Sequence, residues 1–133
     1  MQKLKTIIVD DNRIYRQSLK MALGRCPEVE GIEIDEADNG LMFLRQLESF
    51  IPSFVLMDIK MPKMNGIQAT QIAIEKYPNI KIIAISTMDD YQSVEKMKEA
   101  GAKAFIAKGF DKQTLISIVM QVLKGNQPFI LKI

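Results

Sequence analysis

The sequence predicts a single α/β domain in which a doubly wound, five-stranded parallel sheet is covered by helices on both faces. Five short apolar segments alternate with five segments of about 10–15 residues that have helical spacing of apolar residues, a pattern typical of βαβ units. The first, third and fourth apolar segments are almost uninterrupted, as expected for strands that are covered on both faces. Polar groups directly follow four of the strands, where an open parallel sheet places its ligand sites.

The elements follow from the local pattern in chain order. Strands are expected near residues 5–10, 32–37, 54–58, 81–86 and 102–107, and helices near residues 13–25, 41–50, 66–76, 91–100 and 112–124. Gly101 and Gly125 stand just past helix ends, where a left-handed backbone is favoured. Prolines that stop or follow helices agree with these boundaries, namely Pro27, Pro52 and Pro78.

The second strand differs from the others in a way that predicts its place in the sheet. Ile32 and Ile34 alternate with Glu33 and Asp35, which suits a partly exposed edge strand. With this strand at the edge, the favoured strand order is 2-1-3-4-5, and the winding reverses between the first and third strands. The acidic residues that follow those two strands would then lie together in the crevice where ligands bind.

Length and composition describe one globular domain. The 133 residues are 47% hydrophobic and 26% charged, and the net charge of +2 gives no reason to expect direct contact with nucleic acid or membrane. Residues 1–124 are assigned to the domain, and residues 125–133 to a C-terminal tail or the start of a linker. Neither a signal peptide nor an apolar stretch of about 20 residues is visible. The single cysteine, Cys26, excludes an internal disulfide, so a cytoplasmic location is expected.

The polar groups at the strand ends form a candidate site. They are Asp10 and Asp11 after the first strand, Asp58 after the third, Ser86 and Thr87 after the fourth, and Lys108 after the fifth. Carboxylates beside a phosphoryl group are typical of a Mg²⁺ site. Taken singly, each group also has an ordinary structural role. The aspartates after the first strand could cap a helix, the two hydroxyls could bond to the backbone, and the lysine could lie at the surface. The chain has no histidine, which excludes His-metal sites, Ser-His pairs and a phosphohistidine of its own.

Four motifs together resemble the receiver domains of bacterial two-component response regulators over nearly the whole chain. They are IIVDDN at residues 7–12, VLMDIKMPKMNG at 55–66, IAIS at 83–86 and GAKAFIAK at 101–108. Segments 61–66 and 101–108 also look like the subgroup that carries a C-terminal helix-turn-helix. The resemblance implies a flavodoxin-like (βα)5 fold for the receiver domain, residues 1–124, and transcriptional control through a DNA-binding domain absent from this chain. A stand-alone receiver that acts by protein contact is the alternative.

The resemblance also implies a role for each matching acidic residue. Asp58 is the phosphoacceptor and takes a phosphoryl group from a phosphohistidine on a separate sensor histidine kinase. Asp11, Asp58 and the backbone carbonyl of Lys60 bind Mg²⁺ directly, while Asp10 acts largely through water. The acidic groups need the Mg²⁺ cofactor because like charges at adjacent strand ends repel each other.

Three further positions complete the implied mechanism. Ser86 and Lys108 bind phosphoryl oxygens, and Ser86 and Phe105 form the switch. The resemblance favours Ser86 over Thr87, and strand alternation agrees because it sends Thr87 to the other face.

The sequence departs from the family pattern at three positions. Gly109 follows Lys108, where family members often have a proline with a cis peptide bond; a cis bond before a non-proline residue costs about 2.5–4 kcal/mol, so a trans bond is expected. Asn65 stands where the family often has Asp. Phe105 replaces a common Tyr, so the switch residue has no hydroxyl to bond outward.

An enzyme and two kinds of binding module are the alternatives to a phosphorylation switch. A phosphatase of the haloacid-dehalogenase type also forms an aspartyl phosphate, but that class has Asp-x-Asp after the first strand, whereas Asn12 stands two residues after Asp10. A degenerate receiver would not need the intact set of site residues, and a flavin-nucleotide binder would not place acidic groups in its first loop. We therefore expect no enzyme, but a phosphoacceptor that assists its own phosphorylation and dephosphorylation.

Two helices carry apolar residues beyond a core-facing stripe and are candidates for a homodimer surface. In the fifth helix the stripe consists of Leu115, Ile118, Val119 and Val122, and the additional residues are Ile116, Met120 and Leu123. The first helix adds Ile14, Tyr15, Leu19 and Leu23. A fifth helix that is simply well buried is the alternative, because single exposed apolar residues are normal.

Overall fold

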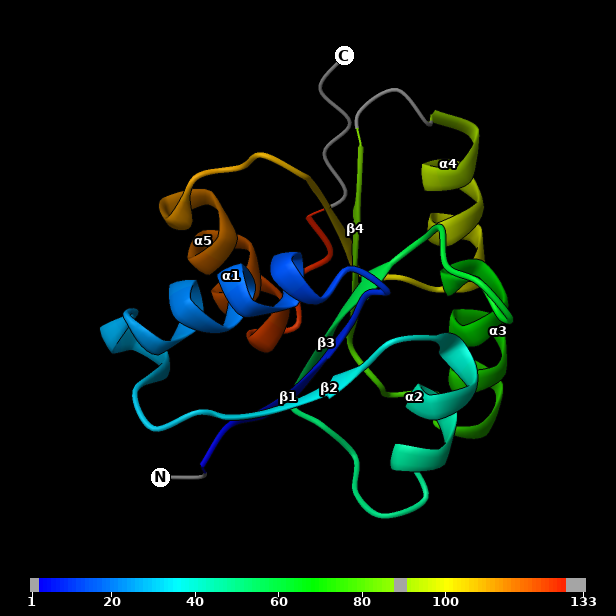
Figure 1. Cartoon of the computed structure of the whole chain (residues 1–133), viewed down its shortest axis with the longest axis horizontal. Coiled ribbons are helices and arrows are strands. Elements are labelled where there is room, and N and C mark those ends of the chain that lie inside the picture. Colours follow the sequence, from blue (N-terminus) through cyan, green and yellow to red (C-terminus); the bar gives the residue numbers. More distant parts are fainter. Residues whose placement is uncertain (1–2, 88–90, 129–133) are drawn as a thin grey trace.

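The computed structural model describes residues 3–87 and 91–128 as five strands and five α-helices that alternate along the chain (Figure 1). The strands are β1 (Lys5–Val9), β2 (Glu33–Ala37), β3 (Phe54–Asp58), β4 (Ile82–Ser86) and β5 (Ala104–Ala107). The helices are α1 (Arg13–Gly24), α2 (Gly40–Gln46), α3 (Gly66–Lys76), α4 (Tyr91–Ala100) and α5 (Lys112–Leu123), and a short 3₁₀ helix, η1 (Pro27–Val29), precedes β2.

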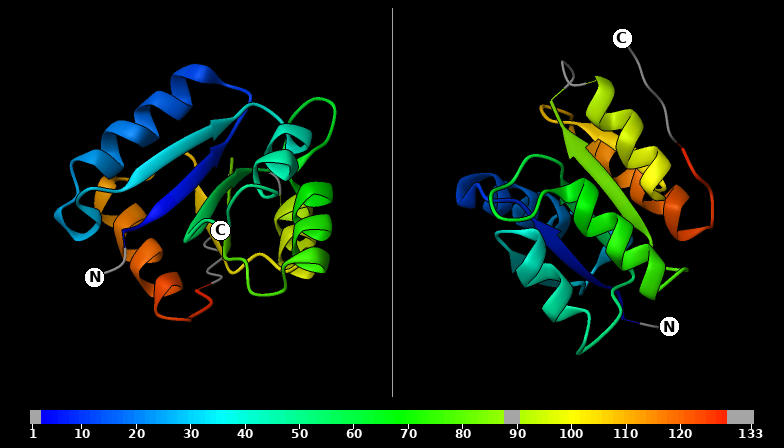
Figure 2. Two further views of the ribbon diagram at one scale, coloured as in Figure 1. Left: turned by 90° about the horizontal axis from the view of Figure 1, so that it is seen from below. Right: turned by 90° about the vertical axis from the view of Figure 1, so that its right-hand side faces the viewer.

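The sheet has the predicted order, β2-β1-β3-β4-β5, and every neighbouring pair is parallel. Helices α1 and α5 cover one face, and α2, α3 and α4 cover the other (Figures 1 and 2). Each face therefore has its own apolar core. β3 and β4 are buried along their whole lengths, and this explains why their sequences are continuous apolar runs.

Several element boundaries differ from the predicted ones because turns compete with the regular elements. Helix α2 ends at Gln46 rather than residue 50, since the Glu48 amide bonds back to the Arg45 carbonyl in a tighter turn. β5 begins at Ala104 rather than residue 102, since the Ala102 amide donates to Met97 and closes the end of α4. Gly101 at that end has φ of 113°, as its predicted capping role requires.

Some residues of the predicted homodimer surface are core residues, whereas Tyr15, Met120 and Leu123 are only partly buried, and the homodimer stays a prediction. Leu19 and Leu23 are 2% and 0% exposed, and Ile116, expected on the outside of α5, is 7% exposed. Ile14 and Met21 of α1 are exposed, at 82% and 55%. Helix α5 buries more than one stripe because it packs against β3 and β5 on the face of the sheet that it shares with α1.

The described part of the chain contains no helix that is both long and apolar enough to cross a bilayer.

Helix α1 is capped by Asn12, whose side chain accepts from the Tyr15 amide at 3.1 Å, so the N-cap is Asn12 and not Asp10 or Asp11. Asp10 instead accepts from the Asn12 amide at 2.8 Å. The two aspartates therefore precede the helix in a short loop at the end of β1.

Candidate functional site

Three carboxylates meet at the carboxyl ends of β1 and β3. Oxygen atoms of Asp10, Asp11 and Asp58 all lie within 4.8 Å of one another. Asp10 and Asp58 are buried, whereas Asp11 is exposed. The predicted strand order brings these residues together because β1 and β3 are neighbours in the sheet.

The main chain around Asp58 is fixed by the start of α3. Asp58 is the last residue of β3, and the Gly66 amide donates to the Ile59 carbonyl at 2.8 Å. A side-chain carbon at Gly66 would collide with the main-chain carbonyl of Asp58, so only glycine allows this close approach. Lys60 lies two residues beyond Asp58 and is exposed, and the use of its carbonyl as a metal ligand stays a prediction.

Lys108 brings an ammonium group into contact with two carboxylates of the acidic cluster. Its Nζ lies 3.2 Å from Asp10 Oδ2 and 3.5 Å from Asp58 Oδ1. Its amide donates to the Ser86 carbonyl at 2.8 Å, which ties the end of β5 to β4. The following peptide bond is not cis, as expected for a bond to Gly109, and Gly109 has φ of 92°. The lysine is thus held between two of the carboxylates at the edge of the sheet.

The electrostatics of the cluster favour a bound cation. Burial and the neighbouring Asp10 raise the pKa of Asp58 to about 6; Lys108 opposes this shift, and Asp11 adds to it. Burial alone would lower the pKa of Lys108, but the charges of Asp58 and Asp10 outweigh it, so the pKa of Lys108 is raised. Three carboxylates gather here and the Lys108 ammonium contacts two of them, so a divalent cation would offset further negative charge.

The donor set fits Mg²⁺ better than a transition metal. All three side chains offer hard carboxylate oxygens, and the chain has no histidine. Mg²⁺ is usually held by one or two carboxylates and keeps several waters, which suits a cluster with one exposed member. Asp10, Asp11 and Asp58 are the residues that would hold it, directly or through water.

The predicted switch residues share one face of the sheet. Ser86 is the last residue of β4 and is 3% exposed, whereas Thr87, which follows the strand, is exposed. Phe105 pairs with Ala84 in the β4–β5 register and is 4% exposed, within the core beneath α2, α3 and α4. The phenyl ring is therefore already inside the protein in this state.

Two residues of α1 contact the site although no sequence motif assigned them a role in it. The centroid of the Tyr15 ring lies 4.7 Å from Lys108 Nζ. The Tyr15 hydroxyl is buried without a hydrogen-bond partner among the described residues. Arg16 donates to the main-chain carbonyl of Asp10 at 2.6 Å. Burial, together with the charges of Asp10 and Asp58, raises the pKa of Tyr15 to about 12. Tyr15 and Arg16 both lie in the first turn of α1, directly after the acidic loop. That position is the signal that could have identified them as neighbours of the site.

Comparison with known proteins agrees with this geometry. Residues 6–120 match the family model of the response regulator receiver domain. The chain is 33% identical over 124 residues to the transcriptional regulatory protein DegU of Brevibacillus brevis, covering 93% of this chain and 52% of that protein. It is 35% identical over 113 residues to the uncharacterized transcriptional regulatory protein YhcZ of Bacillus subtilis, covering 85% of this chain and 52% of that protein. The chain thus spans about half the length of these relatives.

A solved structure shows the same fold. The response regulator receiver domain protein (CheY-like) from Methanospirillum hungatei superposes with a TM-score of 0.83 at 27% identity, covering 93% of this chain and 96% of that one. Both chains are thus matched over nearly their whole lengths, and the matched region of this chain includes the acidic cluster. The chain therefore belongs to the family of response regulator receiver domains.

Proposed function

We propose that this domain is a phosphorylation-controlled switch whose phosphoacceptor is Asp58. The observation that carries the proposal is the position of the Asp58 carboxylate, buried at a strand end, within 4.8 Å of the other two acidic groups and 3.5 Å from Lys108 Nζ. A nucleophile placed between a cation site and a lysine suits phosphoryl transfer, which needs positioning and charge stabilisation more than covalent help.

The donor is a phosphohistidine on a sensor histidine kinase. An Asp58 Oδ–P bond forms as the N–P bond of the phosphohistidine breaks, and the electron pair of that bond returns to the imidazole nitrogen. Mg²⁺, when bound, supplies positive charge against the phosphoryl oxygens. Lys108 already lies beside Asp58 and can pair with a phosphoryl oxygen without leaving the site. Ser86, at the end of the neighbouring strand β4, donates a hydrogen bond from its hydroxyl to another phosphoryl oxygen.

The change of state runs from Ser86 to Phe105. A phosphoryl group adds acceptor oxygens that draw the Ser86 hydroxyl toward Asp58, and the space behind β4 is then filled by the Phe105 ring. Because Phe105 has no hydroxyl and is already buried, phosphorylation selects among packed arrangements of the ring rather than pulling it in from solvent. A ligand can shift the two states only by its differential affinity for them.

The output belongs to a longer protein. Relatives about twice as long as this chain carry names of transcriptional regulators, which supports control of transcription through a further, DNA-binding domain. The proposed location is the cytoplasm. The alternative is a stand-alone receiver that acts through its surface. A homodimer through α1 and α5 has less apolar surface to use than the sequence predicted, and Ile14 and Met21 are the exposed apolar residues of α1 that it could bury. Sedimentation of phosphorylated and unmodified protein would detect such a dimer.

Acetyl phosphate provides the simplest test of the proposed function. With Mg²⁺ present, intact-mass measurement should show one added phosphoryl group, which is absent without Mg²⁺ and absent in Asp58→Asn. Asp38→Asn is the matched control, because Asp38 is an exposed aspartate that follows β2, the strand beside β1. Labelling of Asp58→Asn equal to that of the wild type would reject Asp58 as the phosphoacceptor. Catalytic turnover of small phosphate esters would instead favour a phosphatase.

A further inference from the structure

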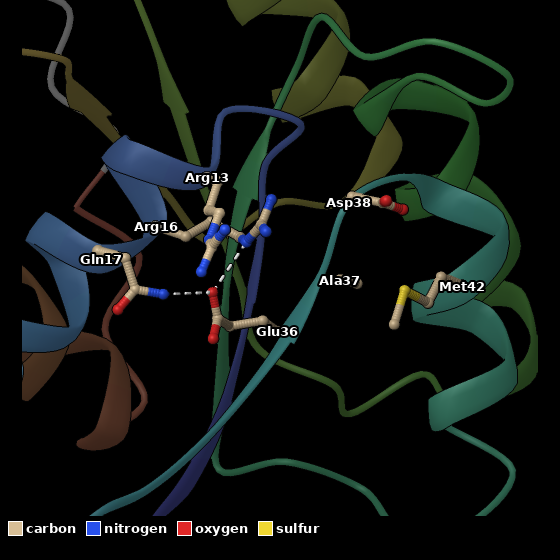
Figure 3. Close-up of a pocket in the computed structure, with 7 residues that line it drawn as sticks. All are labelled: Arg13, Arg16, Gln17, Glu36, Ala37, Asp38 and Met42. Carbon is tan, nitrogen blue, oxygen red and sulfur yellow. Dashed lines mark hydrogen bonds and ion pairs between the residues drawn. The ribbon is translucent and has the colours of Figure 1, made fainter.

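Arg16 joins the acidic loop to the edge strand β2. Its Nη1 donates to the main-chain carbonyl of Asp10 at 2.6 Å, and its Nε donates to Glu36 Oε1 at 2.9 Å. The close-up in Figure 3 shows the Arg16 side chain reaching from α1 toward Glu36 on β2. The side chain is only 14% exposed, so this contact is largely shielded from water.

Arg16 completes the restraint of the main chain at Asp10. The Asp10 amide donates to the Ala37 carbonyl of β2 at 3.0 Å, and the Asp10 carbonyl accepts from Arg16. The Asp10 carbonyl lies in the same peptide plane as the Asp11 amide, because the peptide bond is planar. Holding that carbonyl therefore fixes the plane from which the exposed Asp11 side chain begins.

The partner of Arg16 on β2 is well suited to anchor it. Burial opposes the charged form of Glu36, yet its hydrogen bonds to Arg16 and Lys20 hold the pKa of Glu36 below its usual value. Glu36 also accepts from Gln17 Nε2 at 3.3 Å (Figure 3). The carboxylate is thus ionised at neutral pH and is held by several residues of α1.

We propose that Arg16 is a positioning residue for the Mg²⁺ site, which it serves by clamping the Asp10–Asp11 peptide plane against β2. This inference rests on the proposed function, because it assumes that the acidic cluster binds Mg²⁺. Groups that hold metal-ligating carboxylates in place commonly change metal affinity 10–100-fold when they are removed. For a site with an exposed ligand we expect the lower end of that range, about tenfold.

The charge of Arg16 makes the proposal easy to separate from a simple electrostatic effect. A cation near the acidic cluster repels Mg²⁺, so loss of the charge alone would tighten Mg²⁺ binding. Loss of the Arg16 contact to the Asp10 carbonyl would instead weaken Mg²⁺ binding. Arg16→Met removes both the charge and the clamp, and Arg16→Lys keeps the charge but loses the planar fork that reaches Asp10 and Glu36 together.

Lys20 provides a matched control. Its Nζ lies 3.2 Å from Glu36 Oε2, so it belongs to the same ion-pair network as Arg16. Its only hydrogen bond described in the structure is to Glu36, and none joins it to the acidic loop. Lys20→Met therefore removes one positive charge from the network and leaves the clamp on Asp10 intact.

The test is Mg²⁺ titration of the whole chain at pH 8, with thermal unfolding to confirm that each variant is folded. The wild type and Lys20→Met should bind with affinities within about twofold of each other, while Arg16→Met and Arg16→Lys should both bind about tenfold more weakly. Hydrogen exchange in the metal-free protein should be faster at the Asp11 and Asn12 amides in the two Arg16 variants only. Phosphorylation by acetyl phosphate should need more Mg²⁺ in those variants and recover at saturating Mg²⁺.

The outcomes separate this inference from the function on which it rests. If the wild type binds no Mg²⁺, the proposed function itself fails. If the wild type binds Mg²⁺ and Arg16→Met binds as tightly or more tightly, Arg16 acts only through its charge and the clamp is rejected. Equal weakening by Lys20→Met would also overturn the inference, because it would assign the effect to the network and not to the Asp10 contact.

Discussion

The Lys108 ammonium lies 3.5 Å from the Asp58 carboxylate, so the proposed phosphoacceptor is paired before any phosphoryl group arrives. This pairing has two opposite consequences. Lys108 keeps Asp58 ionised against burial and the charge of Asp10. It also places a positive charge beside the carboxylates of the proposed Mg²⁺ site.

Lys108→Met should therefore tighten Mg²⁺ binding at pH 8, roughly fivefold or about 1 kcal/mol, because the competing cation is gone. Phosphorylation should nevertheless slow, because the phosphoryl oxygens lose a partner. Lys103→Met, at the opposite end of β5, is the control and should change neither quantity. Weaker Mg²⁺ binding in Lys108→Met would contradict this account of the pairing.

Mg²⁺ affinity should depend on pH through Asp58. Its pKa of about 6 means that the carboxylate is ionised at pH 8 and largely protonated at pH 5. Since a protonated carboxyl is a poor ligand, the apparent affinity should fall about tenfold per pH unit below pH 6. Titrations between pH 5 and pH 8 would show this, and a constant affinity over that range would place the ionisation elsewhere.

Asp58→Asn should stabilise the metal-free protein at pH 7. The pKa of Asp58 is raised from 3.8 to about 6 in the folded state, so its stabilising contribution is complete below pH 3.8 and is lost as the pH rises through 6. After a discount for solvent screening, the gain at pH 7 is about 1–2 kcal/mol. Urea unfolding in the presence of a chelator would measure it, with Asp38→Asn as a control that should be nearly neutral.

The Tyr15 hydroxyl should destabilise the protein, because it is buried without a partner among the described residues. Tyr15→Phe keeps the ring beside Lys108 and should raise the free energy of unfolding by about 1 kcal/mol at neutral pH. Because the pKa of Tyr15 is raised to about 12, the wild type should also lose stability between pH 10 and pH 12, and the variant should lose less. Equal stability of the two proteins at neutral pH would mean that the hydroxyl has a partner, such as water.

Much of the site could be predicted from the sequence because its groups follow strands directly. Once Glu33 and Asp35 placed β2 at the edge, the strand order brought Asp10 and Asp58 together without any side-chain detail. Strand alternation separated Ser86 from Thr87 in the same way, and Ser86 is the buried residue of the two.

The contributions of α1 could not be predicted, because they depend on how the helix is rotated against the sheet. Arg16 reaches the Asp10 carbonyl and Tyr15 reaches Lys108 only in the packed structure, and neither contact leaves a period or motif in the sequence. Three residues of the predicted association surface, Leu19, Leu23 and Ile116, are core residues for a related reason. Apolar spacing shows which residues prefer burial, but it does not show whether Ile116 is buried by the protein's own core or by a partner.

The most direct test of the account is to locate the phosphoryl group chemically. After reaction with acetyl phosphate and Mg²⁺, borohydride reduces an aspartyl phosphate to homoserine, and peptide mass spectrometry then identifies the position. The account predicts homoserine at position 58 alone, with none in the untreated protein. Homoserine at position 10 would contradict it, because that position is the nucleophile expected of a phosphatase of the haloacid-dehalogenase type.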